Sequence, residues 1–218
     1  MAGKQVARVF AERISIDVNT GYLLYLPEGY GREVKKWPLV LFLHGAGERG
    51  TDVELVKKHG PPKLVEAAKH YPFILVSPQC PGDEFWSVPV LKALLDKILE
   101  RYDVDRSRIY LTGLSMGGNG TWRLATAYPQ LFAAIAPICG WGDTGKVSVL
   151  KDVPAWVFHG KKDPVVLYER GKSMVKALKA AGGNVKFTVY PEALHDSWTE
   201  TYQNPEFYEW LLAQKRGG

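Results

Sequence analysis

The stretch "YLTGLSMGGNGTW" (residues 110–122) places Ser115 at the junction of an apolar run and a helix-like run. Its residues Gly113-Leu114-Ser115-Met116-Gly117 fit the pattern G-x-S-x-G, in which a serine stands on a sharp turn between a strand and a helix. Glycine weakens both kinds of element. Glycines on both sides of one serine therefore indicate that these positions serve a purpose other than the stability of the strand or the helix.

The expected reason for these glycines is steric. On such a turn the serine takes a strained backbone conformation, and bulky side chains two residues away would collide with it or with neighbouring elements. The turn then holds the hydroxyl at the rim of a sheet, over a helix N-terminus that favours developing negative charge. The pattern alone is weak, because glycine and serine are common in loops. Its context strengthens it, since a strand-like run precedes it and "MGGNGTWRLATAYP" follows.

The rest of the chain alternates strand-like and helix-like runs. This alternation predicts an α/β fold with a mostly parallel sheet covered by helices on both faces, and chemistry beyond the carboxyl ends of the strands. We expect one domain over residues 1–218, with residues 1–20 as an N-terminal extension or edge strand that the pattern assigns poorly. The expected strands are 22–27, 38–45, 73–79, 108–114, 132–138, 155–160 and 185–191, and the clearest helices are 90–102, 167–183 and 204–215.

Composition bounds the class of protein. The 218 residues are 46% hydrophobic and 23% charged, which is ordinary for a soluble globular chain. No apolar run approaches the roughly 20 residues of a membrane span, and the first residues lack the apolar segment of a secretory signal. The chain is thus expected to be cytoplasmic or a trimmed secreted domain. The net charge of +5 is spread among acids, as in "LKALLDKILERYDVDRSR", which argues against nucleic-acid binding.

The two cysteines, Cys80 and Cys139, are too few for a disulfide framework. No CxxC motif or His/Cys cluster indicates a metal site. Each cysteine follows an expected strand, which leaves a bridge between them open, although free thiols are favoured.

A serine nucleophile needs a base, and in this arrangement the partners follow the serine in the order acid, then histidine. His195 lies just past the last expected strand, where a loop can fold back over the rim. His159 ends a strand and is expected to pack or to support the next loop. His44 opens a glycine-rich loop, whereas His59 and His70 are expected at the surface.

The acid that orients the histidine is expected to be Asp163, which follows the next-to-last strand by a few residues. Asp143 is the competitor, one strand earlier. Asp196 is adjacent to His195, so its side chain is expected to point away.

The tetrahedral intermediate needs hydrogen-bond donors for its oxyanion. One is expected to be the backbone N–H of Met116, directly after the serine. The other is expected from the glycine-rich loop "LHGAGERG" (residues 43–50), with the N–H of Ala46 first and that of Gly47 second.

Several motifs together resemble the serine esterases of the α/β-hydrolase superfamily, in the group of bacterial and metagenomic carboxylesterases, predicted peptidases and phospholipase/carboxylesterase-like proteins. The resemblance runs from about Leu23 to the C-terminus. It implies a triad of Ser115, Asp163 and His195, oxyanion donors at Ala46 and Met116, a small-molecule ester as substrate, and neither a metal nor an organic cofactor. The motifs are "LFLHGAGERG", "SPQCPGDEFW", "YLTGLSMGGNGTW", "APICGWGD", "HGKKDPVV" and "LHDSW".

The segment between Cys139 and the strand at Ala155 is too short for a helical lid, so we expect an open site, short acyl chains and no membrane partner. Trp86, Trp141 and Trp198 are candidate pocket walls, with core packing as the equal alternative. The leading function is carboxylic ester hydrolysis. Alternatives are an acetyl or feruloyl esterase on plant polysaccharide, a peptidase or thioesterase, and a non-enzymatic binding module. The oligomeric state stays open.

Overall fold

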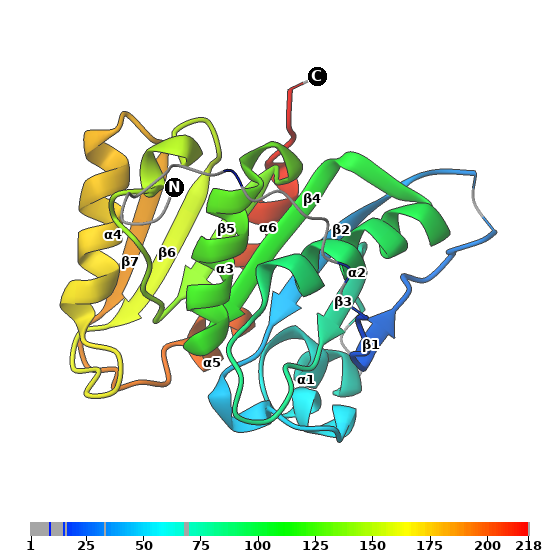
Figure 1. Ribbon diagram of the computed structural model, residues 1–218, viewed down its shortest axis with the longest axis horizontal. Helices are drawn as coiled ribbons and strands as arrows, with labels where there is room; N and C mark the ends of the chain where they lie inside the picture. The colour runs from blue at the N-terminus through cyan, green and yellow to red at the C-terminus, as the bar shows by residue number, and fades with distance from the viewer. Residues whose placement is uncertain (1–8, 10–14, 16, 33, 68–69, 218) are drawn as a thin grey trace, which may run out of the picture.

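We describe a computed structural model that places residues 9, 15, 17–32, 34–67 and 70–217. The expectation for residues 1–20 falls largely outside these residues, and that of a single domain stays a prediction. Seven strands form one sheet in the order β1-β3-β2-β4-β5-β6-β7 (Figure 1). They are β1 (Tyr22–Tyr25), β2 (Trp37–Leu43), β3 (Ile74–Pro78), β4 (Val104–Leu114), β5 (Ala134–Ile138), β6 (Ala155–Gly160) and β7 (Val185–Tyr190).

The expected α/β fold with a mostly parallel sheet is confirmed. Only β1 runs antiparallel to its neighbour, β3, and the other adjacent pairs are parallel. Their carboxyl ends therefore meet at one rim, the lower edge in Figure 1. The strand register aligns these carboxyl ends, because Gly113 of β4 pairs with Leu43 of β2, and Ile138 of β5 pairs with Phe158 of β6.

Helices cover both faces of the sheet. On one face lie α2 (Val88–Arg101), α3 (Met116–Ala127) and α4 (Tyr168–Ala180), and on the other lie α1 (Gly60–Glu66), α5 (Trp198–Gln203) and α6 (Pro205–Ala213) (Figure 1). The fully buried strand β2 shows why both faces need cover. Leu39, Leu41 and Leu43 pack towards α2 and α3, whereas Val40 and Phe42 pack towards α6.

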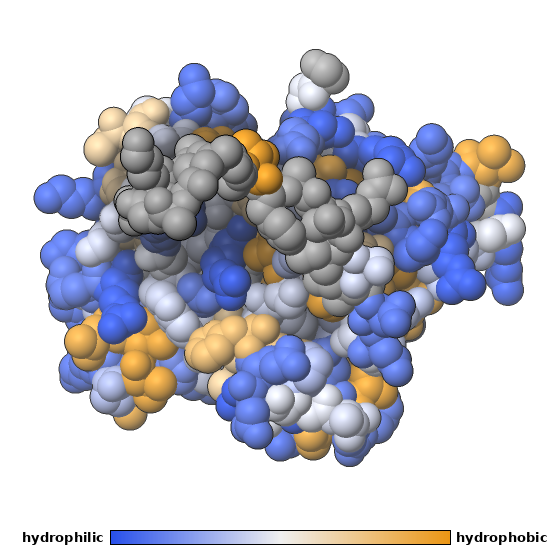
Figure 2. Space-filling model, in the orientation of Figure 1, coloured by the Kyte–Doolittle hydropathy of each residue, from blue (hydrophilic) through white to orange (hydrophobic). Residues whose placement is uncertain are grey.

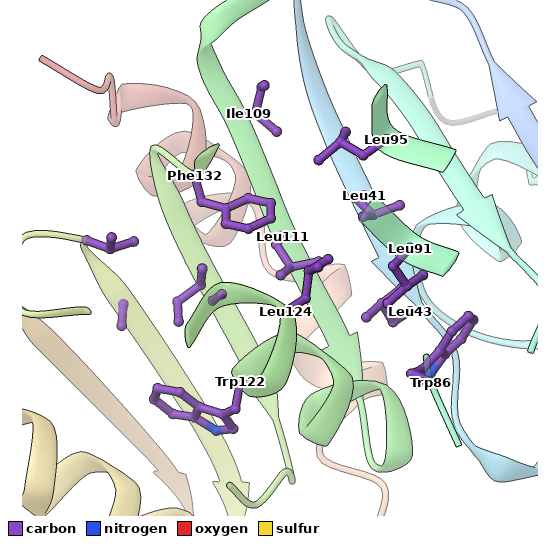
Figure 3. Close-up of a cluster of buried hydrophobic side chains, with 14 of the residues drawn as sticks. Leu41, Leu43, Trp86, Leu91, Leu95, Ile109, Leu111, Trp122, Leu124 and Phe132 are labelled. Atoms are coloured by element: carbon purple, nitrogen blue, oxygen red, sulfur yellow. The ribbon is translucent and has the colours of Figure 1, made fainter. Parts of the chain in front are cut away.

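The core beneath α2 follows from its sequence. Leu91, Leu94, Leu95 and Ile98 step by three and four residues, so they form one stripe, and all four are buried in the core. Figure 3 shows Leu91 and Leu95 of this stripe. Each fully buried side chain of this size stabilises the fold by about 1.5–3 kcal/mol. The helix expected at residues 90–102 is thus present as α2, and this stripe anchors it to the sheet.

Some short elements differ from the expectation. The helices α1 and α5, and the 3-10 helices η1 (Ala46–Glu48), η2 (Val53–Lys58), η3 (Pro129–Leu131) and η4 (Val147–Leu150), carry no long apolar period. Helix α1 begins at Gly60 and has two prolines in its first turn, where a helix tolerates proline. The same prolines make the segment look unlike a helix in the sequence. Of the helices described, none combines the length and apolar character that crossing a membrane requires.

Candidate active site

Ser115 stands at the turn between β4 and α3 with φ 54° and ψ −115°, in the left-handed region that residues other than glycine rarely occupy. The two glycines of the motif make this turn sterically accessible. A Cβ on Gly113 would lie 2.4 Å from the carbonyl oxygen of Gly117, and one on Gly117 would lie 1.9 Å from that of Leu43. The backbone of the turn is therefore packed too closely for any side chain there.

His195 reaches this serine from the loop after β7. Its Nε2 lies 2.9 Å from Ser115 Oγ, and its Nδ1 lies 2.8 Å from Asp163 Oδ2. A carboxylate only accepts hydrogen bonds, so Nδ1 carries the ring proton and Nε2 is left to accept from the serine hydroxyl. The side chain of His195 is 20% exposed, which leaves the array open to solvent on one side.

Asp163 is held by its own loop. Its Oδ1 accepts the backbone N–H groups of Val165 (2.8 Å) and Val166 (2.9 Å), while Oδ2 faces His195. The carboxylate is fully buried and has hydrogen-bond partners on both oxygens, as a buried charge requires.

The two alternative acids lie elsewhere. Asp143 is exposed, and its Oδ1 accepts the N–H of Gly145. Asp196 is also exposed, and its carboxylate accepts the N–H and hydroxyl of Thr199. The structure thus brings Asp163 to the histidine and leaves both alternatives in local turns.

The loops that carry the acid and the histidine are joined through their backbones. Lys161 N–H donates to Tyr190 O (2.9 Å), and Lys162 N–H donates to Ala193 O (3.1 Å). At the end of β6, a Cβ on Gly160 would lie 2.1 Å from Leu194 O, so only glycine permits this approach. The distance between Asp163 and His195 is therefore set by strand pairing that continues into the loops.

The glycine-rich loop after β2 lies against the serine, since a Cβ on Gly45 would be 3.7 Å from Ser115 Cβ. The N–H of Gly45 donates to Glu48 Oε2 at 3.0 Å, and this carboxylate is nearly buried. The N–H of Gly45 is therefore engaged within the loop. Ala46 and Gly47 follow it in η1, and both are exposed at the rim.

His44 fixes this loop to the one after β3. Its Nδ1 lies 2.6 Å from Gly45 O and its Nε2 accepts the N–H of Cys80 at 2.9 Å, which requires the neutral ring with its proton on Nδ1. Burial lowers the pKa of His44 to about 4. His44 is thus a neutral structural histidine at neutral pH.

The three tryptophans have different surroundings. Trp86 is 4% exposed, packs on His44 with ring centroids 4.7 Å apart, and donates its indole N–H to His44 O. Figure 3 shows it beside Leu43 and Leu91, so the structure places it in the core. Trp141 is half-buried, and its carbonyl accepts a hydrogen bond from the side chain of Asn119, which lies one turn after Ser115 in α3. It borders a cavity of about 560 Å³.

Trp198 is the tryptophan beside the histidine of the array. Its ring lies edge-on to His195, with centroids 5.2 Å apart, and edge-on to His59 at 5.4 Å. His59 is partly buried and its Nε2 lies 3.8 Å from Glu48 Oε1. The expected surface position holds, since the side chain of His59 is 34% exposed. Its contact with Trp198 could not be read from the sequence, because α5 brings Trp198 to it from a distant part of the chain.

A thiol lies behind the array. Cys139 directly follows β5, has φ 39°, and is fully buried. Among the described residues, the one set of donor atoms close enough to bind an ion is formed by Cys139, Asp163 and His195, within 4.8 Å of one another. Asp163 and His195 are already bonded to each other, and burial raises the pKa of the Cys139 thiol. These groups fit a protonated thiol packed against a hydrogen-bonded pair better than an ion site. Cys80 and Cys139 are both free.

Exposed apolar side chains surround the rim near the acid and the histidine. Val165 and Leu167 follow Asp163, and Leu194 precedes His195; each is more than half exposed. Figure 2 shows orange side chains at the lower left, over the loops after β6 and β7. The rim therefore offers apolar surface beside the hydrogen-bonded array.

A mostly parallel sheet with a serine elbow after a central strand, an acid after β6 and a histidine after β7 defines the α/β-hydrolase fold. The chain belongs to the phospholipase/carboxylesterase family, whose model matches residues 86–206. The expected superfamily and membership of an ester-hydrolase family are therefore confirmed.

Individual relatives agree. A thermostable esterase of solved structure is 40% identical and superposes with a TM-score of 0.77; the match covers 89% of this chain and 59% of that one. A bifunctional acetylxylan esterase/xylanase of Neocallimastix patriciarum is 26% identical, covering 68% of this chain and 24% of that protein. A probable carboxylesterase of Oryza sativa subsp. japonica is 26% identical, covering 84% and 88%. The chain thus spans about a quarter of the fungal protein and well under two thirds of the thermostable esterase.

Proposed function

We propose that this protein is a serine carboxylesterase that hydrolyses short-chain acyl esters through Ser115, His195 and Asp163. One observation carries the proposal: the continuous hydrogen-bonded array from Ser115 Oγ through His195 to Asp163, on a strained elbow. A serine hydroxyl is a poor nucleophile without a base, and this array supplies one. Family membership supports an ester as the bond that is cleaved.

In the first half of the reaction, Ser115 Oγ attacks the ester carbonyl while His195 Nε2 takes the hydroxyl proton. Asp163 stabilises the resulting imidazolium through the Nδ1–H bond and keeps the ring in its required tautomer. The tetrahedral intermediate then collapses. The carbon–oxygen bond to the alcohol breaks, His195 returns its proton to the leaving oxygen, and the acyl group stays on the serine.

In the second half, water replaces the alcohol. His195 Nε2 takes a proton from water as its oxygen attacks the acyl carbon, and the bond to Ser115 Oγ then breaks. The proton passes from His195 back to the serine, and the carboxylic acid leaves. The exposed side of His195 supports this step, because water reaches the ring without a structural change.

The oxyanion is assigned to the backbone N–H groups of Met116 and Ala46. Met116 is the first residue of α3 and Ala46 the first of η1, positions whose N–H groups lack an acceptor within the helix. Gly45 is left out because Glu48 holds its N–H. A donor of this kind contributes about 3–4 kcal/mol to transition-state stabilisation.

A short acyl group is favoured by the connection between β5 and β6. In residues 139–154 the one helical element is η4 (Val147–Leu150), so this connection supplies no helical cover for a long chain. Trp198 beside His195, and Trp141 bonded to Asn119, remain the proposed pocket walls, whereas Trp86 supports the loop that carries Ala46.

A second candidate is removal of acetyl groups from plant polysaccharide. It is favoured by the similarity to a protein named as a bifunctional acetylxylan esterase/xylanase. An open rim with an exposed histidine also suits a polymer, which cannot enter a closed pocket. The chemistry at Ser115 would be the same, and the two candidates differ only in the alcohol that leaves.

The decisive experiment is hydrolysis of p-nitrophenyl esters from acetate to palmitate by the wild-type chain and by Ser115→Ala. We expect activity to fall steeply with chain length and to drop at least about 10³-fold in the variant, while circular dichroism shows the same fold. Activity that survives in Ser115→Ala would refute the nucleophile, and activity that rises towards palmitate would refute the short-acyl preference. Acetate release from acetylated xylan, compared with p-nitrophenyl acetate, separates the two candidates.

A further inference from the structure

A second histidine lies within reach of the acid. His159 is the penultimate residue of β6 and is fully buried. Its Nε2 is 2.7 Å from Val166 O and 3.4 Å from Asp163 Oδ2. Both oxygens only accept, so Nε2 carries the ring proton. The shorter contact has ordinary hydrogen-bond length and the longer one lies outside it, so the bond to Val166 dominates.

The opposite side of the ring is closed by α4. A Cβ on Gly171 would lie 2.4 Å from His159 Nδ1, and this nitrogen has no hydrogen-bond partner among the described residues. A second proton there would have no acceptor, and burial lowers the pKa of His159. The ring is therefore neutral at neutral pH, with a fixed tautomer.

These contacts form a chain of hydrogen bonds from His159 through Val166 to the acid. The N–H of Val166 donates to Asp163 Oδ1 at 2.9 Å, and the carbonyl of the same residue accepts from His159 at 2.7 Å. One peptide segment thus connects the carboxylate to the end of β6. Removing the histidine proton would leave Val166 O without this partner and release the turn that presents Asp163.

On the basis of the proposed esterase mechanism, we propose that His159 is a positioning residue. Its neutral ring ties the Val166 carbonyl to β6, and so holds Asp163 at hydrogen-bond distance from His195. His159 touches neither substrate nor nucleophile. It acts through the acid, and its effect appears in how well Asp163 stabilises the imidazolium of His195.

Other charged groups nearby have partners of their own. Lys161, in the loop before α4, and Lys172, on α4, lie over the ring of Tyr168. Tyr168 meets His159 edge-on, with ring centroids 6.1 Å apart.

Lys162 after β6 forms an ion pair with Glu192 after β7, and the carboxylate of Asp196 accepts a hydrogen bond from the N–H of Thr199. The titratable groups on the elements around His159 and Asp163 include Lys161, Lys162, Tyr168, Lys172, Tyr190, Glu192, His195, Asp196 and the thiol of Cys139.

The test compares His159→Leu with His159→Gln in the full chain. Leucine fills similar space without a donor, whereas the glutamine amide places an N–H near the position of Nε2. We expect His159→Leu to lower kcat for p-nitrophenyl acetate about tenfold or more, with little change in KM. The acidic limb of the pH profile of kcat/KM should also move to lower pH, because the His195 imidazolium loses its well-placed acid, Asp163. His159→Gln should restore most of kcat and the wild-type profile.

An NMR titration of the His195 imidazole in the same variants gives a readout without turnover. A lower pKa of His195 in His159→Leu than in wild type and His159→Gln would support the proposal. An unchanged or higher value in His159→Leu would overturn it, as would a loss of kcat in His159→Gln as large as in His159→Leu. Failure of the proposed function appears separately, as absence of ester turnover and of fluorophosphonate labelling at Ser115 in the wild-type chain.

Discussion

At the scale of single residues, close backbone approach determines this site. Ser115 occupies a rare backbone conformation, and the chain accepts that strain because neighbouring elements fix the turn on both sides. Gly117 shows the tightest case, with the carbonyls of Leu43 and His44 directly against its Cα. The glycine therefore serves the fold as much as the chemistry.

Replacing Gly117 with alanine tests this. The added Cβ would lie 1.9 Å from Leu43 O and 2.7 Å from His44 O, so β2 and α3 must separate. We expect a loss of at least about 2 kcal/mol in the free energy of unfolding, measured by urea denaturation. Gly82→Ala is the matched control, because a Cβ there meets nothing within 4 Å. Equal stability of the two variants would contradict the steric account.

At the scale of elements, the loop after β2 is fixed from two directions. His44 bonds it to the loop after β3, and Glu48 bonds it to itself through the N–H of Gly45. The loop can therefore present the proposed oxyanion donor, the N–H of Ala46, without rearranging when a substrate arrives, which is the advantage of preorganised donors.

Glu48→Ala is expected to lower kcat about tenfold, with a smaller change in KM. The reason is that the variant loses a hydrogen bond to a buried carboxylate and leaves the N–H of Gly45 unpaired. Glu48→Gln keeps an acceptor oxygen and should recover most of the rate. Steady-state kinetics on p-nitrophenyl acetate measure both. If the two variants lose kcat equally, the carboxylate acts by its charge and not by holding the loop.

At the scale of the whole molecule, buried neutral histidines link stability to pH. The pKa of His44 is about 4 in the folded chain and 6.5 ordinarily, and that of His159 is also lowered. The unfolded chain therefore binds more protons between these values, and stability must fall as the pH falls through that window.

We expect the free energy of unfolding to fall by about 2 kcal/mol between pH 7 and pH 5 from His44 alone, with His159 acting in the same direction. This contribution is fully present above pH 6.5 and is lost progressively towards pH 4. Urea denaturation at both pH values measures it. His44→Gln should flatten the dependence, whereas His70→Gln, at an exposed position, should leave it unchanged. A wild-type stability equal at both values would contradict the lowered pKa.

Much of the site could be predicted because the positions of the strands can be read from local apolar runs. Ser115, Asp163 and His195 each follow an apolar run by a few residues, and parallel strands bring such positions to one rim. Contacts between loops that are distant in the sequence have no such local pattern. Burial of Trp86 against His44, and the ring contact between His59 and Trp198, depend on how long loops fold over each other. Helix α1 was missed because two prolines and a short length leave no apolar period.

The position of β7 at the edge of the sheet has a consequence for synthesis. Among the described residues it pairs only with β6, and it is the last of the seven strands in chain order. A chain in which β7 has not docked can form the serine turn and the loop at Ala46, yet it lacks the proposed base. Ester cleavage by a nascent or refolding chain would thus begin only when β7 docks, so the onset of turnover reports that event.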